Sequence, residues 1–139
     1  MISKIDISDI ESVISLGKEI DKKFDKLYDI KNLPENETIY VYKDNDEVIG
    51  FLHILKTLDF IDILNLVVRE ESRKEGIASL LIDYLLSNKD LPPKIMLEVR
   101  ESNKAAIMLY NKFNFEVVNV RKKYYGNDNA LIMERKTNL

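Results

Sequence analysis

The stretch from Ile63 to Leu81 constrains the fold more than any other part of this 139-residue chain. It begins as an apolar run that ends in the β-branched pair Val67-Val68, which is typical of a strand. After a charged segment, apolar residues recur with a helical period on one face: Ile77, Leu80, Leu81, Tyr84 and Leu85. The sequence therefore predicts a strand, a tight loop and the start of a helix.

The motif Arg73-x-x-Gly76-x-Ala78 lies where this loop becomes the helix. The first N–H groups of a helix have no partner within it, and neither Gly76 nor Ala78 has a side chain that would block a ligand. From Arg69 to Gly76, two arginines and one lysine face three glutamates. Backbone amides and the helix dipole would therefore do most of the binding of a phosphate-bearing anion.

The same residues also bear on three other interpretations of the loop. No Gly-Lys-Ser/Thr sequence follows the glycine, which disfavours a P-loop, and the three spaced glycines of a Rossmann dinucleotide site are missing. An ordinary strand-to-helix turn, whose glycine only relieves crowding, explains the motif alone at least as well as a phosphate site does.

The N-terminal half predicts a strand, one or two helices and a meander of strands. Residues 2–7 have the pattern of a short strand, and Ser8 with Glu11 forms a capping-box pair before an amphipathic helix that starts at Ile10. A second short helix is expected between residues 24 and 33, before Pro34. Three strands then follow, with a hairpin turn at residues 44–47: Thr38–Lys43, Val48–Lys56 and Phe60–Arg69.

The C-terminal half alternates helix and strand before a final hairpin. A helix over Glu75–Asn88 is followed by a strand over Lys94–Arg100, which implies a parallel crossover. Asn103 is expected to cap the next helix. The tail predicts two strands, Phe115–Lys122 and Ala130–Glu134, joined across residues 126–129.

The composition and charge of the chain disfavour several classes of protein. With 45% hydrophobic and 32% charged residues, the chain suits one domain over residues 1–139. A formal charge of -3 gives no electrostatic footprint for nucleic acid, and the lack of cysteine excludes disulfides and thiolate chemistry. The first ten residues are unlike a signal peptide, and no apolar run is long enough to span a membrane. We expect a soluble cytoplasmic protein without a metal.

Two resemblances identify a family. The segment Arg73–Ala78 resembles the acetyl-CoA pyrophosphate signature of GNAT-type N-acetyltransferases, and the order of elements is similar to theirs over nearly the whole chain. The second resemblance is to bacterial ribosomal-protein alanine N-acetyltransferases and their protein N-terminal relatives, and it rests on four segments: Leu97–Tyr110, Phe113–Phe115, Arg121–Tyr125 and Ala130–Met133. It implies an α/β (α+β) GNAT fold, a mixed and mostly antiparallel sheet with a central parallel strand pair splayed for acetyl-CoA and helices on both faces.

The resemblance also implies roles for individual residues. The strand main chain at Leu66, Val67 and Val68 would pair with the pantetheine arm, and Asn103 would contact the cofactor from the following helix. The pyrophosphate would bind the loop amides of seven residues: Arg73, Lys74, Glu75, Gly76, Ile77, Ala78 and Ser79.

Catalytic and substrate roles follow from the same matches. Glu98 matches the general base and Tyr110 the acid that protonates the leaving CoA thiolate, while Tyr124 and Tyr125 match a pair beside the substrate's N-terminal end. Each residue also has an ordinary interpretation. Glu98 could be a solvated strand carboxylate and Tyr110 a core aromatic. Tyr124 and Tyr125 could be favourable strand residues next to a turn. Asn103 could likewise be only a helix cap.

An energy estimate favours an α-amine over lysine as the acceptor. Freeing the nucleophilic amine at pH 7 costs roughly 1.4 kcal/mol for an α-amine of pKa about 8, but roughly 4.6 kcal/mol for lysine of pKa about 10.4. One glutamate is sufficient to deprotonate an α-amine. Together with the resemblance, this estimate gives the main hypothesis: direct acetyl transfer from acetyl-CoA to a protein N-terminus, such as that of a ribosomal protein.

Two alternatives stay open at this point. The acceptor could be a small amine such as an amino acid, polyamine or antibiotic, because the ribosomal enzymes commonly carry a Pro-Trp motif and this chain has no tryptophan. The chain could also be a CoA-sensing or partner-binding module without catalysis. Its exposed edge strands are compatible with either a monomer or a homodimer. His53 is expected to be a strand residue, and four acidic residues are expected to be solvated charges: Asp59, Asp62, Glu70 and Glu71.

Overall fold

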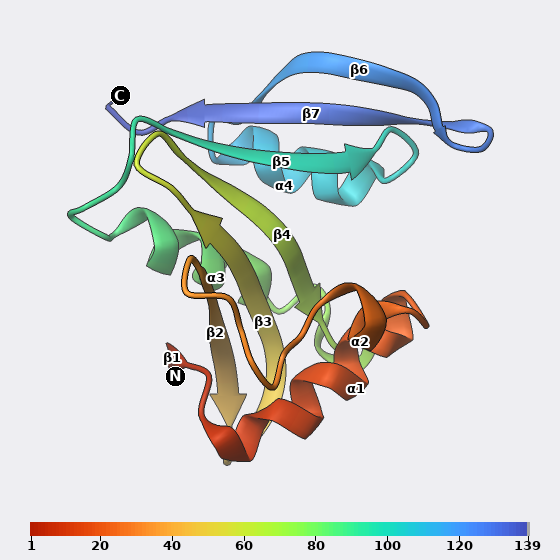
Figure 1. The fold of residues 1–139 in the computed structure, drawn as a ribbon. Helices are drawn as coiled ribbons and strands as arrows, with labels where there is room; N and C mark the ends of the chain where they lie inside the picture. The colour runs from red at the N-terminus through yellow and green to blue at the C-terminus, as the bar shows by residue number, and fades with distance from the viewer. Residues whose placement is uncertain (139) are drawn as a thin grey trace. The chain divides into compact units, whose positions relative to one another are not determined.

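The structure is a computed structural model, and it describes residues 1–138. The order of elements is β1 (Ile2–Lys4), η1 (Ile7–Asp9), α1 (Ile10–Ile20), α2 (Phe24–Leu27), β2 (Glu37–Asp44), β3 (Glu47–Lys56), β4 (Phe60–Val68), η2 (Glu70–Ser72), α3 (Ile77–Leu86), β5 (Lys94–Arg100), α4 (Lys104–Lys112), β6 (Glu116–Tyr125) and β7 (Asp128–Lys136), where η marks a 3-10 helix (Figure 1). The strands follow the order β1-β2-β3-β4-β5-β7-β6. The predicted succession of helices and strands is confirmed.

The chain forms two compact units, and β4 contributes residues to both. The first unit comprises residues 1–56 and 65–88, and the second comprises residues 57–64 and the chain from residue 89 onward.

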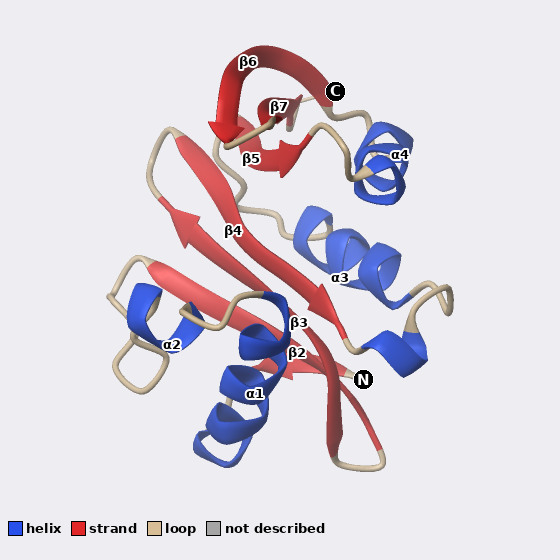
Figure 2. Cartoon of the chain, turned by 90° about the vertical axis from the view of Figure 1, so that its right-hand side faces the viewer, coloured by secondary structure: helices blue, strands red, loops and turns tan. Residues whose placement is uncertain are grey.

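In the first unit, helices cover both faces of β2 and β3 (Figure 2). Because side chains alternate along a strand, the odd residues of β2 face α1 and α2, whereas Tyr40 stacks on Tyr84 of α3. The apolar core under α1 and α2 consists of nine buried residues: Val13, Leu16, Phe24, Ile30, Ile39, Val41, Val48, Phe51 and Val67. Burying this much apolar surface is the main stabilising term of the unit.

A glycine in β3 allows β4 to lie close beside it. A Cβ added at Gly50 would lie 2.8 Å from the Val67 carbonyl oxygen, which is shorter than real contacts allow. The neighbouring Ile49 carbonyl accepts a hydrogen bond from the Arg69 N–H, so the end of β4 is anchored before the loop begins. Position 50 therefore admits only glycine without a shift of the backbone.

The second unit is a sheet of mixed direction with α4 beside it (Figure 1). β5 pairs with β7 and β7 with β6, both antiparallel, whereas β4 and β5 are parallel. The parallel ladder covers four residue pairs and ends at Ile63 and Leu97, although β4 continues to Val68 and β5 to Arg100. The predicted mixed sheet and the parallel crossover at its centre are confirmed.

Several predicted details at the N-terminus are wrong. The first strand ends at Lys4, and Ile7 already belongs to a 3-10 helix. The capping box is formed by Asp6 and Asp9 rather than by Ser8 and Glu11, because the 3-10 turn places the start of helical structure earlier. The second helix stops at Leu27, well before Pro34.

The turns also differ from their predicted lengths. Asn45 and Asp46 both have positive φ and form a two-residue hairpin turn, so β2 and β3 extend to Asp44 and Glu47. In the tail hairpin, Tyr125 pairs with Asp128, which leaves only two residues in the turn and lengthens both strands beyond prediction. Helix α3 starts at Ile77, two residues later than expected. No helix within residues 1–138 is long and apolar enough to cross a membrane.

Candidate functional site

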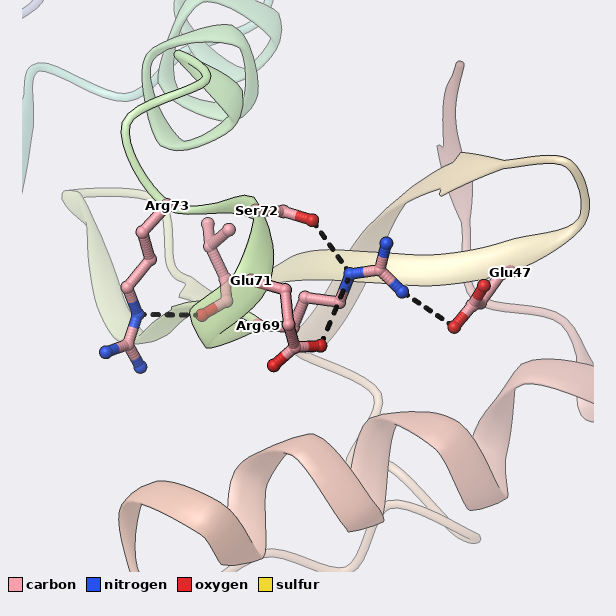
Figure 3. Close-up of polar contacts among 6 residues, drawn as sticks. Glu47, Arg69, Glu71, Ser72 and Arg73 are labelled. Atoms are coloured by element: carbon pink, nitrogen blue, oxygen red, sulfur yellow. Dashed lines mark hydrogen bonds and ion pairs between the residues drawn. The ribbon is translucent and has the colours of Figure 1, made fainter.

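The loop after β4 is held together by its own arginines (Figure 3). Arg69 donates from Nε to the Ser72 hydroxyl and from Nη1 to the Glu47 carboxylate of the neighbouring hairpin, both at 2.7 Å. The Ser72 side chain is buried, so this contact satisfies a hydroxyl that would otherwise lack a partner. Glu71 lies 3.9 Å from the same guanidinium. The guanidinium of Arg69 is thus engaged by the loop and by the neighbouring hairpin.

Arg73 also binds inward. Its Nε donates to the Val68 carbonyl at 3.2 Å (Figure 3), so one acceptor on the predicted pantetheine strand carries a hydrogen bond within the chain. A carbonyl oxygen has a second lone pair, and the N–H groups at the end of the guanidinium remain available. Lys74 is the remaining cation of the loop, and it is exposed.

The backbone between Lys74 and Ser79 leaves a row of amides without acceptors. Lys74 and Gly76 have φ values of 71° and 80°, which turn the chain sharply into α3. The first hydrogen bond of the helix comes from the Leu80 N–H to the Gly76 carbonyl, and the preceding six N–H groups make none within the described chain. No atom lies within 4 Å of a Cβ built at Gly76, so the approach is open. This set of donors fits a pyrophosphate.

The predicted pantetheine strand is only partly exposed. Val67 is buried in the apolar core of the first unit, whereas Leu66 and Val68 are half-buried. What β4 can offer a ligand here is therefore its main chain rather than its side chains.

Glu98 lies on the polar face of β5 in the second unit. Ile95, Leu97 and Val99 are buried on one face of this strand, as the alternation predicted, and Glu98 projects from the other. The Glu98 carboxylate lies 3.8 Å from Nη1 of Arg121 on β6, which is an ion-pair distance but longer than a hydrogen bond. Glu98 is therefore neutralised only in part.

Asp62 was expected to be a solvated charge, and this is wrong. It lies in β4 directly opposite Met96 of β5, and its side chain is half-buried. Burial and, second, the nearby Glu98 carboxylate raise the pKa of Asp62 above its usual value. The sequence gives the strand face of Asp62 through alternation, but no local pattern indicates which residue of another strand lies beside it.

Tyr110 is a core residue of the second unit. It is the buried side chain of α4, with 8% of its surface exposed, and its ring packs edge-on against Phe115. Burial raises the pKa of the Tyr110 hydroxyl to about 12. The ordinary interpretation as a core aromatic therefore holds, and the phenol is a weaker acid here than in water.

The other predicted residues of the second unit are engaged in local contacts. The Asn103 side chain accepts a hydrogen bond from the Ala106 N–H at 3.2 Å, so it does cap α4. Tyr124 and Tyr125 pack edge-on, with ring centroids 5.1 Å apart. The Arg100 guanidinium lies 4.1 Å above the Tyr125 ring and that of Arg121 lies 5.5 Å above Tyr124, so two cations fix the pair.

His53 belongs to a buried polar triad that the sequence pattern did not predict. Its Nε2 lies 2.7 Å from the Glu37 carboxylate and its Nδ1 lies 3.1 Å from the Asn65 amide nitrogen. Burial lowers the pKa of His53, although Glu37 opposes this shift. A neutral ring with its proton on Nε2 satisfies both contacts, donating to Glu37 and accepting from Asn65. His53 is thus a satisfied strand residue, as expected. Within residues 1–138, no group of three or more His, Cys, Asp or Glu side chains is placed to hold a metal ion.

Comparison with known proteins gives one consistent result. The sequence matches the Acetyltransferase (GNAT) family over residues 5–115. An N-alpha-acetyltransferase of Sulfolobus acidocaldarius is 30% identical over 145 aligned positions, and the match covers 91% of this chain and 86% of the relative. A ribosomal protein bS18-alanine N-acetyltransferase of Haemophilus influenzae is 35% identical over 98 residues, covering 65% and 66% of the two chains. The crystal structure of Ard1 from Thermoplasma volcanium superposes with a TM-score of 0.83 at 29% identity, covering 98% of this chain and 96% of that one.

Proposed function

Because the chain belongs to the acetyltransferase (GNAT) family, we propose that it transfers the acetyl group of acetyl-CoA to the N-terminal α-amine of a protein. The observation that carries the proposal is the row of six free amides at the start of α3, beside an open glycine. An enzyme of this family needs such a row to hold the cofactor's pyrophosphate, because Arg69 and Arg73 of the loop already bind groups of the protein.

The cofactor would be bound mostly by main chain. In this proposal the free amides of Lys74 to Ser79 hold the pyrophosphate, whereas the predicted Arg73 amide already donates to the Glu70 carbonyl. Leu66 to Val68 pair with the pantetheine arm, and Asn103 adds a contact through its side-chain amide. The side-chain oxygen of Asn103 already accepts the hydrogen bond that caps α4, whereas its side-chain amide nitrogen is free to donate one. Acetyl-CoA supplies an acetyl group activated as a thioester.

Glu98 is the proposed general base. It takes one proton from the acceptor nitrogen while this nitrogen bonds to the acetyl carbon, and the electron pair of the broken C–S bond leaves with sulfur. Two features of Glu98 support the role: it projects from the polar face of β5, and the nearby Arg121 guanidinium is not within hydrogen-bond distance of it. Tyr124 and Tyr125 are the proposed neighbours of the substrate's N-terminal residue.

Tyr110 is the proposed proton donor to sulfur, and its environment sets a condition on that role. With a pKa of about 12 against about 8.5 for an ordinary thiol, donation to a water-like thiolate would cost roughly 5 kcal/mol. The donation becomes favourable only where the thiolate is desolvated as strongly as the phenol. Replacing Tyr110 by Phe should lower kcat if it donates, and should leave kcat unchanged if water protonates the sulfur.

The experiment follows thiol release from acetyl-CoA with two peptides. One begins with alanine and has a free N-terminus; the other has a blocked N-terminus and contains lysine. Transfer to the first alone supports the proposal, and a series of N-terminal sequences then tests a ribosomal protein as the target. Thermal stabilisation by acetyl-CoA without transfer to either peptide would overturn the α-amine acceptor and leave small amines or a non-catalytic role.

A further inference from the structure

We propose that Asp62 binds the acceptor as an ammonium ion, so that this protein selects cationic amines and positions them for deprotonation by Glu98. The inference rests on the proposed function, because it concerns the acceptor of that reaction. It adds a specificity residue on β4 that the motifs of the sequence do not contain.

Strand register places the two carboxylates on one surface. Asp62 lies opposite Met96 in the parallel ladder, and Glu98 is two residues further along β5. Residues two apart on a strand project from the same face, so the side chains of Asp62, Met96 and Glu98 share it. The opposite face is closed by Ile61 and Ile63, which are 1% and 6% exposed.

Nearby cations on β5 and β6 already have partners. Lys94 lies 4.0 Å from Glu134, Arg121 lies 3.8 Å from Glu98, and the guanidinium of Arg100 covers the ring of Tyr125. Among the described residues, Asp62 forms neither a hydrogen bond nor an ion pair through its side chain. A half-buried carboxylate is thus left beside a second carboxylate with no protein cation of its own.

An ammonium ion supplies what this arrangement lacks. Desolvation and the Glu98 charge both oppose ionisation of Asp62, and a cation placed beside the two carboxylates counters both effects. With a pKa of about 8, an α-amine is mostly protonated at pH 7 and would arrive in this form. One N–H proton passes to Glu98 and from there to solvent, which frees the nitrogen lone pair for attack. Glu98 then takes a second proton from nitrogen as the amide forms, while Asp62 continues to hold the acceptor in place.

The test compares a cationic acceptor with an uncharged analogue. The acceptor is a peptide beginning with alanine, and the analogue is the same peptide beginning with a lactyl group, which has a hydroxyl in place of the ammonium and acts as a competitive inhibitor. In Asp62→Asn, we expect KM for the alanine peptide to rise about tenfold, because a charge-assisted contact is lost, and the inhibition constant of the lactyl peptide to change less than about twofold.

A matched variant controls for the loss of one negative charge. Asp59 is exposed in the turn before β4, so Asp59→Asn makes the same chemical change away from the ladder and should leave both constants unchanged. An unchanged KM in Asp62→Asn, or an equal change for both peptides, would overturn the inference while the proposed function stands. If the wild-type protein acetylates no peptide, the proposed function fails, and this inference fails with it.

Discussion

The loop after β4 and the polar face of the β4–β5 ladder use their polar groups in opposite ways. In the loop, the arginine side chains bind within the protein, and a row of backbone amides is left free. In the ladder, the backbone is paired, and side-chain carboxylates are left incompletely neutralised. Free amides suit an anion and free carboxylates suit a cation, so the two regions are complementary to the two substrates of an acetyl transfer.

Neutralising the carboxylate proposed as the base should affect catalysis more than any other change. Glu98→Gln keeps the shape of the side chain but removes its ability to take a proton, so we expect kcat to fall about 100-fold or more while the affinity for CoA is unchanged. Thiol release measures kcat, and calorimetric titration with CoA measures affinity. Glu116→Gln on the exposed β6 strand serves as the control. Wild-type kcat in Glu98→Gln would remove Glu98 from the mechanism.

A second variant acts on the free amides alone. Gly76 has a φ of 80°, so Gly76→Ala strains the backbone by about 1 kcal/mol or more and turns the amides away, although space for the Cβ exists. We expect the dissociation constant for CoA to rise about tenfold.

Gly126 offers a matched control for this strain. It has a φ of 71° and equally open surroundings, but it lies in the β6–β7 turn. Gly126→Ala should lower the melting temperature about as much as Gly76→Ala does and leave CoA binding unchanged. Equal CoA affinities in the two variants would mean that the loop does not bind the cofactor through its backbone.

The contrast between the regions also explains what could be predicted from sequence. The junction between loop and helix at Gly76, the bounds of β5 and the polar face of Glu98 follow from local patterns, namely a motif between a strand and a helix and strict alternation. The partners of Arg69 and the surroundings of Asp62 do not follow from local patterns. Arg69 reaches a hairpin 22 residues earlier, and Asp62 acquires its environment from the register of a parallel ladder, which no local pattern specifies.

Two further differences have the same origin. Asp6 with Asp9 and Ser8 with Glu11 both have the spacing of a capping box, so only the tertiary structure decides which pair is used. His53 was correctly expected in a strand, but its bonds to Glu37 and Asn65 come from two other elements. Where the determining contacts cross between elements, sequence patterns alone were insufficient.

A third prediction tests whether the cations of the loop act through geometry or through charge. Arg69→Lys keeps the charge but cannot bond both Ser72 and Glu47 through a planar guanidinium, and it leaves the buried Ser72 hydroxyl without its donor. We expect a dissociation constant for CoA about threefold to fivefold higher, together with a lower melting temperature. If Arg69→Lys binds CoA as the wild type does while Arg69→Ala does not, charge rather than loop geometry would be the contribution of this residue.

A smaller effect, on the melting temperature, tests without any substrate whether the Asp62 carboxylate is unneutralised. Because the folded-state pKa of Asp62 is raised, ionisation of this group opposes folding, and its cost grows as pH rises from the unfolded pKa through the folded one. Asp62→Asn should therefore raise the melting temperature at pH 7 by about 2 °C. The gain should disappear near pH 3, where Asp62 is protonated in both states. A lower melting temperature at pH 7 would show that Asp62 has a stabilising partner, and the unneutralised carboxylate on which the cation site depends would not exist.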